Sequence, residues 1–190
     1  SDRARQLAKV FVQKDFCRLN TPCFNRKKFL KDLLFVAMTD FGPDLEGILT
    51  AFPSADLKGT LPMELINLKQ LYIAETEKYA HVTYFFNGGY ADPIAGEARQ
   101  IIPSPDVKSY DATPAMSSEK LTKEVINNLA KQKYDFTVLN LAAPDMVAHT
   151  GNLAAGVECC HEVDKYLGEI VKAYLRSGGT ILITADHGNI

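Results

Sequence analysis

Two clusters of metal-ligand residues, each following a short apolar run, constrain this chain more than any other feature of its sequence. The first run leads to Asp145 and His149, and the second leads to Asp186 and His187. Short apolar, β-branched runs that end in such loops are typical of buried strands in open α/β sheets, which bind ligands beyond the carboxyl ends of their strands. The pattern therefore predicts an α/β fold with both clusters at strand ends.

The chemistry of these clusters suits a divalent transition metal such as Mn²⁺ or Zn²⁺, and the oxygen donors add tolerance for harder ions. Asp145 and His149 can meet one ion if their segment forms a helical turn. Asp186 and His187 are neighbours whose side chains point in different directions, so they more naturally serve two ions. An Asp-x-x-x-His by itself is more often a capped helix or a surface pair. Two such clusters, each followed by glycine, favour a two-metal site.

Composition excludes several other classes of function. The chain has 190 residues, 46% of them hydrophobic, which is enough for a substantial core in one or two domains. Its formal charge of −2 gives no basic bias towards nucleic acid or membranes, and no apolar run has the length of a membrane span. Four cysteines are too few for a disulfide scaffold, and the N-terminus lacks the apolar core of a signal peptide. We expect a reduced, cytoplasmic protein.

The order of periodic segments predicts alternating helices and strands, and hence a largely parallel sheet. Helical spacing predicts helices over 4–13, 61–68, 77–86, 117–129 and 154–176. Apolar runs predict strands over 34–39, 70–74, 136–141 and 180–184. The stretch 40–60 is rich in proline and glycine and favours a boundary. We therefore expect one domain over residues 1–52 and another over residues 53–190.

Longer motifs resemble those of a known family, the cofactor-independent phosphoglycerate mutases of the alkaline-phosphatase superfamily. The motifs are Pro-Asp-Met-Val-Ala-His-Thr-Gly at 144–151, Thr-Ala-Asp-His-Gly-Asn at 184–189, and Ile-Ala-Glu-Thr-Glu-Lys-Tyr-Ala-His-Val-Thr-Tyr-Phe-Phe-Asn-Gly-Gly at 73–89. Asp2-Arg3 is similar to the end of the family's arginine-rich substrate motif. Ala148 replaces a usual glycine. The resemblance covers nearly the whole chain.

The resemblance implies an enzyme that interconverts 3-phosphoglycerate and 2-phosphoglycerate in glycolysis and gluconeogenesis through a phosphoserine intermediate. It implies two divalent ions, Mn²⁺ first with Mg²⁺ or Co²⁺ as alternatives, and no 2,3-bisphosphoglycerate. The expected fold is an alkaline-phosphatase-like, mostly parallel sheet flanked by helices in residues 53–190, with the tail of an inserted α/β transferase domain in residues 1–52. The resemblance also implies a small-molecule substrate, no nucleic-acid or membrane partner, and a monomeric parent protein.

Carried over to this chain, the family's metal ligands fall on four residues. Asp145 and His149 would ligate one ion, and Asp186 and His187 the other.

Two further positions match residues that contact the substrate. Lys78 would bind the phosphoryl group and stabilise its charge, as a catalytic and substrate-binding residue. Arg3 would bind the substrate, since a guanidinium suits carboxylate and phosphate. Without the resemblance, a lysine in a first helical turn and a solvated terminal arginine would be the simpler interpretations. Glu75, Glu77 and His81 are expected to have structural or supporting roles.

Two departures from the family pattern bear on activity. None of the serines stands in the family's nucleophile motif, and a further histidine ligand is expected after Ile190. We expect a fragment of the mutase that is inactive by itself, with an exposed sheet edge and a tendency to associate. The alternatives are another phosphotransferase of the superfamily, such as a phosphopentomutase or a phosphodiesterase, and a non-catalytic module that binds metal or a partner chain.

Overall fold

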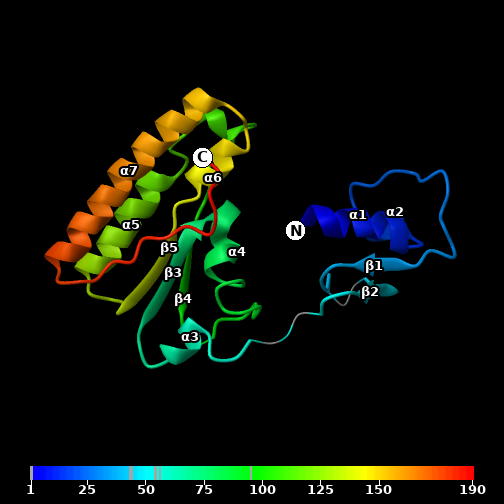
Figure 1. Ribbon diagram of the computed structural model, residues 1–190, viewed down its shortest axis with the longest axis horizontal. Coiled ribbons are helices and arrows are strands. Elements are labelled where there is room, and N and C mark those ends of the chain that lie inside the picture. The colour runs from blue at the N-terminus through cyan, green and yellow to red at the C-terminus, as the bar shows by residue number, and fades with distance from the viewer. Residues whose placement is uncertain (1, 43–44, 54, 56, 95) are drawn as a thin grey trace. The chain divides into compact units, whose positions relative to one another are not determined.

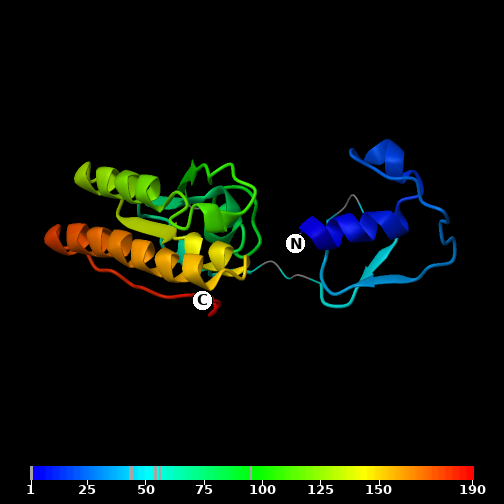
Figure 2. The ribbon, with the colours of Figure 1, turned by 90° about the horizontal axis from the view of Figure 1, so that it is seen from above.

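The computed structural model divides the chain into two compact units, residues 1–55 and 56–190. Figures 1 and 2 show the elements of each unit from two directions. The structure describes residues 2–42, 45–53, 55, 57–94 and 96–190. The sequence placed the boundary after residue 52, three residues before this division. Each unit is described separately below.

The first unit is a small α/β arrangement. Its elements are α1 (Asp2–Val12), α2 (Phe16–Leu19), β1 (Phe35–Ala37) and β2 (Ile48–Thr50). The two strands pair in parallel, with Phe35 opposite Ile48. The short elements α2 and β2 were not predicted, because three or four residues are too few to show a periodicity.

The first unit also contains a disulfide between Cys17 and Cys23. The expectation that the cysteines are reduced is therefore wrong for this pair. The two residues are six positions apart, and only the turn between α2 and the following segment brings their Cα atoms to 5.2 Å.

The second unit is built around a parallel sheet. Its elements are α3 (Leu61–Glu64), β3 (Gln70–Glu75), the 3₁₀ turn η1 (Thr76–Lys78), α4 (Tyr79–Val82), β4 (Ala98–Ile102), η2 (Tyr110–Ala112), α5 (Ser118–Ala130), β5 (Phe136–Asn140), α6 (Ala143–Ala148) and α7 (Leu153–Arg176). The strand order is β4-β3-β5, with β3 parallel to both neighbours. Because β3 is central, all six of its residues are buried.

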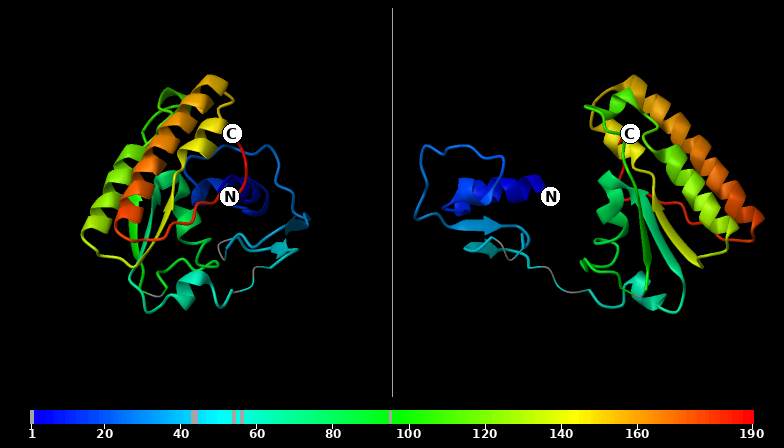
Figure 3. Two further views of the ribbon diagram at one scale, coloured as in Figure 1. Left: turned by 60° about the vertical axis from the view of Figure 1, so that its left-hand side comes forward. Right: turned by 180° about the vertical axis from the view of Figure 1, so that it is seen from behind.

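Helices cover both faces of this sheet, which confirms the predicted α/β class. On one face, Leu71 and Ile73 pack with Leu121 of α5 and Ile170 of α7. Figures 1 and 3 show α5 and α7 side by side on that face. Tyr72, with Ala74, points to the opposite face and packs with Val82 of α4. The alternation of side chains along β3 places its odd-numbered residues, Glu75 included, on the side of α5.

Two predicted elements near the site are wrong. The helix expected over 77–86 ends at Val82, where the Thr83 hydroxyl donates a hydrogen bond to the Tyr79 carbonyl at 2.7 Å and competes with the helical ladder. The strand expected over 180–184 is absent, because this segment pairs with no strand among the described residues, and Leu182 is 90% exposed. Figure 1 shows the segment returning from the end of α7 towards α6. An isolated run has no partner for its backbone groups and cannot be a strand.

Another strand was missed. β4 lies in the stretch 87–116, for which no helix or strand was predicted. The described helices include none with the length and apolar character that a membrane crossing needs.

Candidate metal centre

The site lies where two neighbouring parallel strands end. β3 and β5 are in register, with Ala74 opposite Asn140, so their carboxyl ends share one edge of the sheet. Just past that edge, β3 continues into the η1 turn that carries Lys78, and β5 leads into α6, which carries Asp145. The parallel order of these strands therefore brings together two residues that are 67 positions apart.

Lys78 and Asp145 form an ion pair at the centre of the site. The lysine Nζ lies 2.5 Å from Oδ2 of Asp145, and the two side chains are 11% and 19% exposed. Burial raises the pKa of Asp145, but hydrogen bonds from Lys78 and Asn189, with the lysine charge, outweigh burial and hold that pKa below its usual value. Asp145 is therefore an ionised carboxylate near neutral pH.

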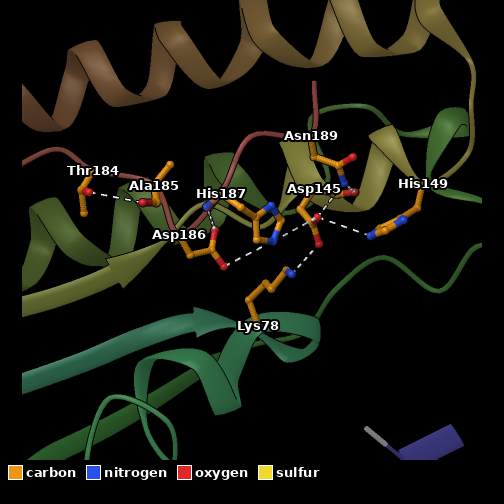
Figure 4. A network of polar contacts seen from close by, with 8 residues as sticks. All are labelled: Lys78, Asp145, His149, Thr184, Ala185, Asp186, His187 and Asn189. Carbon is orange, nitrogen blue, oxygen red and sulfur yellow. Dashed lines mark hydrogen bonds and ion pairs between the residues drawn. The ribbon is translucent and has the colours of Figure 1, made fainter. Parts of the chain in front are cut away.

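The other oxygen of Asp145 faces two imidazoles, as Figure 4 shows. Oδ1 lies 3.4 Å from Nε2 of His149 and 4.0 Å from Nε2 of His187. Oδ2 of Asp186 lies 3.6 Å from the same His187 nitrogen. The side-chain amide of Asn189 donates a hydrogen bond to Oδ1 of Asp145 at 2.8 Å.

These donors suit a divalent metal ion in their chemistry, and one pair of them also has the spacing of two ligands on one ion. Two ligand atoms about 2.1 Å from one ion in tetrahedral geometry lie roughly 3.4 Å apart. The separation between Asp145 Oδ1 and His149 Nε2 is of this size. Within the described part of the chain, no group of three or more His, Cys, Asp or Glu residues is arranged so that it could hold a metal ion. The imidazoles of His149 and His187 are 67% and 54% exposed, so both rings are free to adjust to an ion.

The sequence matches the metalloenzyme superfamily over residues 49–190. The chain belongs to this superfamily. The four residues predicted to be metal ligands all lie inside the matched region. The match fits a site built from two carboxylates and two imidazoles.

The individual relatives of this chain have more specific names. It is 45% identical over 190 residues to a 2,3-bisphosphoglycerate-independent phosphoglycerate mutase of Cyanothece sp., which covers 99% of this chain and 34% of the relative. The enzyme of the same name from Moorella thermoacetica is 47% identical, over 100% of this chain and 36% of the relative. A crystal structure of Leishmania mexicana phosphoglycerate mutase at low cobalt concentration aligns with a TM-score of 0.74 and 29% identity, over 96% of this chain and 33% of that chain. The chain thus spans about a third of the length of the relatives it matches.

The predicted site residues fall into two groups. Lys78, Asp145, His149, Asp186 and His187 converge in one network, while their roles as ligands or catalyst stay predictions.

Arg3 lies within α1 of the first unit, and its side chain is outside the described residues.

Sequence reasoning missed Asn189, although it ends the Thr-Ala-Asp-His-Gly-Asn motif. The motif itself was the available signal.

The turn that carries Lys78 is held by contacts from other segments. The backbone N–H of Ser104 donates a hydrogen bond to the Thr76 hydroxyl at 3.3 Å. The hydroxyl of Tyr110 donates one to Glu77 at 3.0 Å. These contacts were not predictable, since each joins residues about thirty positions apart. They fix the backbone on either side of Lys78.

Glu75 lies directly before this turn and is completely buried. Neither of its carboxylate oxygens has a hydrogen bond of ordinary geometry among the described residues, although the Ser117 backbone and the Ser104 hydroxyl are near enough to affect its pKa. Burial raises the pKa of Glu75 to about 7, against the smaller lowering effects of the Ser117 backbone and the Ser104 hydroxyl. The sequence analysis gave Glu75 a structural or supporting role, and its burial against α5 is consistent with support of the η1 turn.

Proposed function

We propose that this chain supplies part of the active site of a 2,3-bisphosphoglycerate-independent phosphoglycerate mutase, which interconverts 3-phosphoglycerate and 2-phosphoglycerate. The observation that carries the proposal is the convergence of Lys78 with Asp145, His149 and His187 at the shared end of β3 and β5. The names of the relatives support it. A transferring phosphoryl group is stabilised by cationic side chains and divalent ions, and the grouping of Lys78 with this carboxylate and these imidazoles supports such a role.

Each side chain has a role that follows from its position. Asp145 and His149 would hold one divalent ion, and Asp186 and His187 the other. When bound, such ions neutralise the charge of a phosphoryl group and activate a hydroxyl nucleophile. Lys78 would donate a hydrogen bond to a phosphoryl oxygen and offset its charge. The ion pair with Asp145 orients the lysine ammonium towards the site, and Asn189 orients the same carboxylate.

Finer features of the mutase belong to the same proposal. We propose Mn²⁺ as the physiological metal, and the cobalt named for the Leishmania structure supports a divalent ion in general. The phosphoserine intermediate, independence from 2,3-bisphosphoglycerate, a role in glycolysis, a cytoplasmic location and a monomeric parent are proposed on the family resemblance. We further propose that the unit 56–190 is phosphatase-like and that the unit 1–55, with Arg3, belongs to the transferase domain.

The test is mutase turnover of the gene's full-length product, with Mn²⁺ and without 2,3-bisphosphoglycerate, measured through coupled enolase. We expect Lys78→Met to lower kcat/KM for 3-phosphoglycerate by roughly 10²–10³-fold, as expected for loss of a charge-stabilising donor. The matched control is Lys172→Met, which removes an exposed lysine of α7 and should leave turnover unchanged.

Two outcomes would contradict the proposal. Conversion of ribose 1-phosphate with no conversion of 3-phosphoglycerate would assign the chain to a phosphopentomutase instead. Equal turnover by wild type and Lys78→Met would remove the lysine from the site. The 190-residue chain by itself is expected to be inactive, because none of its serines stands in the nucleophile motif.

A further inference from the structure

The Cys17–Cys23 disulfide has features of a reactive bond rather than a buried structural one. Both residues are exposed, so a reagent can reach the sulfurs without unfolding the chain. Cys17 lines a cavity of about 340 Å³ together with the basic residues Lys14, Arg18 and Arg26, and with Asp15, which pairs with Arg18. Nearby positive charge stabilises the thiolate that leaves when a disulfide is cut. Of the remaining cysteines, Cys159 is buried and both are unpaired.

The disulfide ties α2 to the segment that holds Arg26. Phe16 of α2 is buried and packs edge-on against Phe24, with ring centroids 5.4 Å apart. The guanidinium of Arg26 stacks over the rings of Phe16 and Phe29, at 5.5 Å and 4.8 Å. The Cys17–Cys23 disulfide therefore holds in place the segment from which the Arg26 side chain extends.

Arg26 in turn stabilises the end of α1. It donates hydrogen bonds to the carbonyls of Val10 at 2.6 Å and Lys14 at 2.7 Å. Val10 lies in the last turn of α1, where carbonyl groups lack partners within the helix. The described core of this unit is small, with Ala8 and Phe16 among its few buried apolar residues. A cross-link has a larger effect on order in such a unit than in one with an extensive core.

We propose that Cys17 and Cys23 form a reversible redox modification site, operated by a dithiol of the thioredoxin type, that controls how firmly Arg26 caps α1. The proposal does not depend on the mutase activity. A thiolate of the dithiol attacks one cysteine sulfur, the sulfur–sulfur bond breaks, and the other cysteine leaves as a thiolate. The second thiol of the reductant then attacks the reductant's sulfur in the mixed disulfide and releases the attached cysteine as a thiolate. Two electrons and two protons pass to Cys17 and Cys23, and the reductant becomes a disulfide.

The first measurement follows the bond itself. The 190-residue chain is equilibrated in buffers of varied reduced-to-oxidised glutathione ratio, quenched, alkylated, digested and examined by mass spectrometry. We expect a linked peptide containing Cys17 and Cys23 that converts to the dithiol form and back with one midpoint. Dithiothreitol should give the dithiol form completely. Absence of the linked peptide even in pure oxidised glutathione would overturn the proposal.

The second measurement follows the cap by hydrogen exchange. Reduction should speed amide exchange in the last turn of α1 and around Arg26 roughly tenfold, because the local opening that exposes these amides becomes easier. Exchange in α5 of the other unit is the internal control and should not change. Cys17→Ser and Cys23→Ser should each show the fast rate in every buffer. Arg26→Lys should speed exchange of α1 without moving the glutathione midpoint. Identical exchange of α1 in the oxidised and reduced wild type would overturn the link to the cap.

Discussion

Replacing Glu75 by glutamine should remove a pH-dependent loss of stability from the second unit. Glu75 is fully buried, and burial raises its pKa to about 7 from a normal value of 4.5. At a pH between these two pKa values, Glu75 keeps its proton in the folded chain and releases it in the unfolded chain. Stability is therefore greatest below pH 4.5 and falls as the pH rises through about 7. The cause is the cost of ionising a buried carboxylate, which the Ser117 backbone and the Ser104 hydroxyl offset only in part.

The size of this loss follows from the pKa difference. At about 1.4 kcal/mol per pH unit, the interval between the two pKa values corresponds to roughly 3 kcal/mol. Glutamine has nearly the same shape and carries no charge at any pH. We therefore expect the free energy of unfolding of Glu75→Gln to exceed that of wild type by about 2–3 kcal/mol at pH 8 and to differ little at pH 4.5.

The assay is urea unfolding of the 190-residue chain at several pH values between 4.5 and 8, for wild type and for Glu75→Gln. Taking the difference between the two proteins cancels the pH dependence of every other group. Glu158→Gln is the matched control, because Glu158 is exposed on α7 and its replacement should leave the pH profile unchanged. A difference between wild type and Glu75→Gln that stays constant over this pH range would refute the reasoning.

Three further predictions concern the metal site, a buried ion pair and a helix cap. Asp145→Asn should weaken Mn²⁺ binding at least about tenfold, since the substitution removes the carboxylate charge that faces both imidazoles. Titration calorimetry measures this affinity, and unchanged binding would exclude Asp145 as a ligand. Glu97→Ala should lower the free energy of unfolding by roughly 3 kcal/mol, because it leaves the mostly buried Arg99 guanidinium without its carboxylate partner. A loss under about 1 kcal/mol would contradict this prediction. Asn152→Ala should cost about 1 kcal/mol, because the side chain of Asn152 caps α7 by accepting from the Ala155 amide, whereas Asn152→Asp should keep most of that stability.

Local sequence was sufficient for the long helices. α5 and α7 lie within one residue of their predicted limits, because their apolar residues recur at helical spacing over several turns. The apolar runs of β3 and β5 were also enough to identify buried strands. Periodicity failed for β4, whose sequence Ala-Arg-Gln-Ile-Ile lies between proline-rich segments and becomes a strand only by pairing with β3.

The same limit applies to the candidate site. Motifs predicted Lys78, Asp145 and the histidines as site residues, because each lies in a run that resembles a family motif. They did not reveal that Lys78 would pair with Asp145, or that Asn189 would donate to the same carboxylate.

The sequence by itself therefore determined the α/β class, the main helices and the residue types of the site. Those properties depend on the periodicity and chemistry of neighbouring residues. Only the tertiary structure decided the strand order, the Cys17–Cys23 pair and the burial of Glu75. It also left residues 180–184 outside the sheet, although their composition favours a strand. Strand pairing and burial depend on which distant segments meet, and a one-dimensional pattern of side chains does not contain that information.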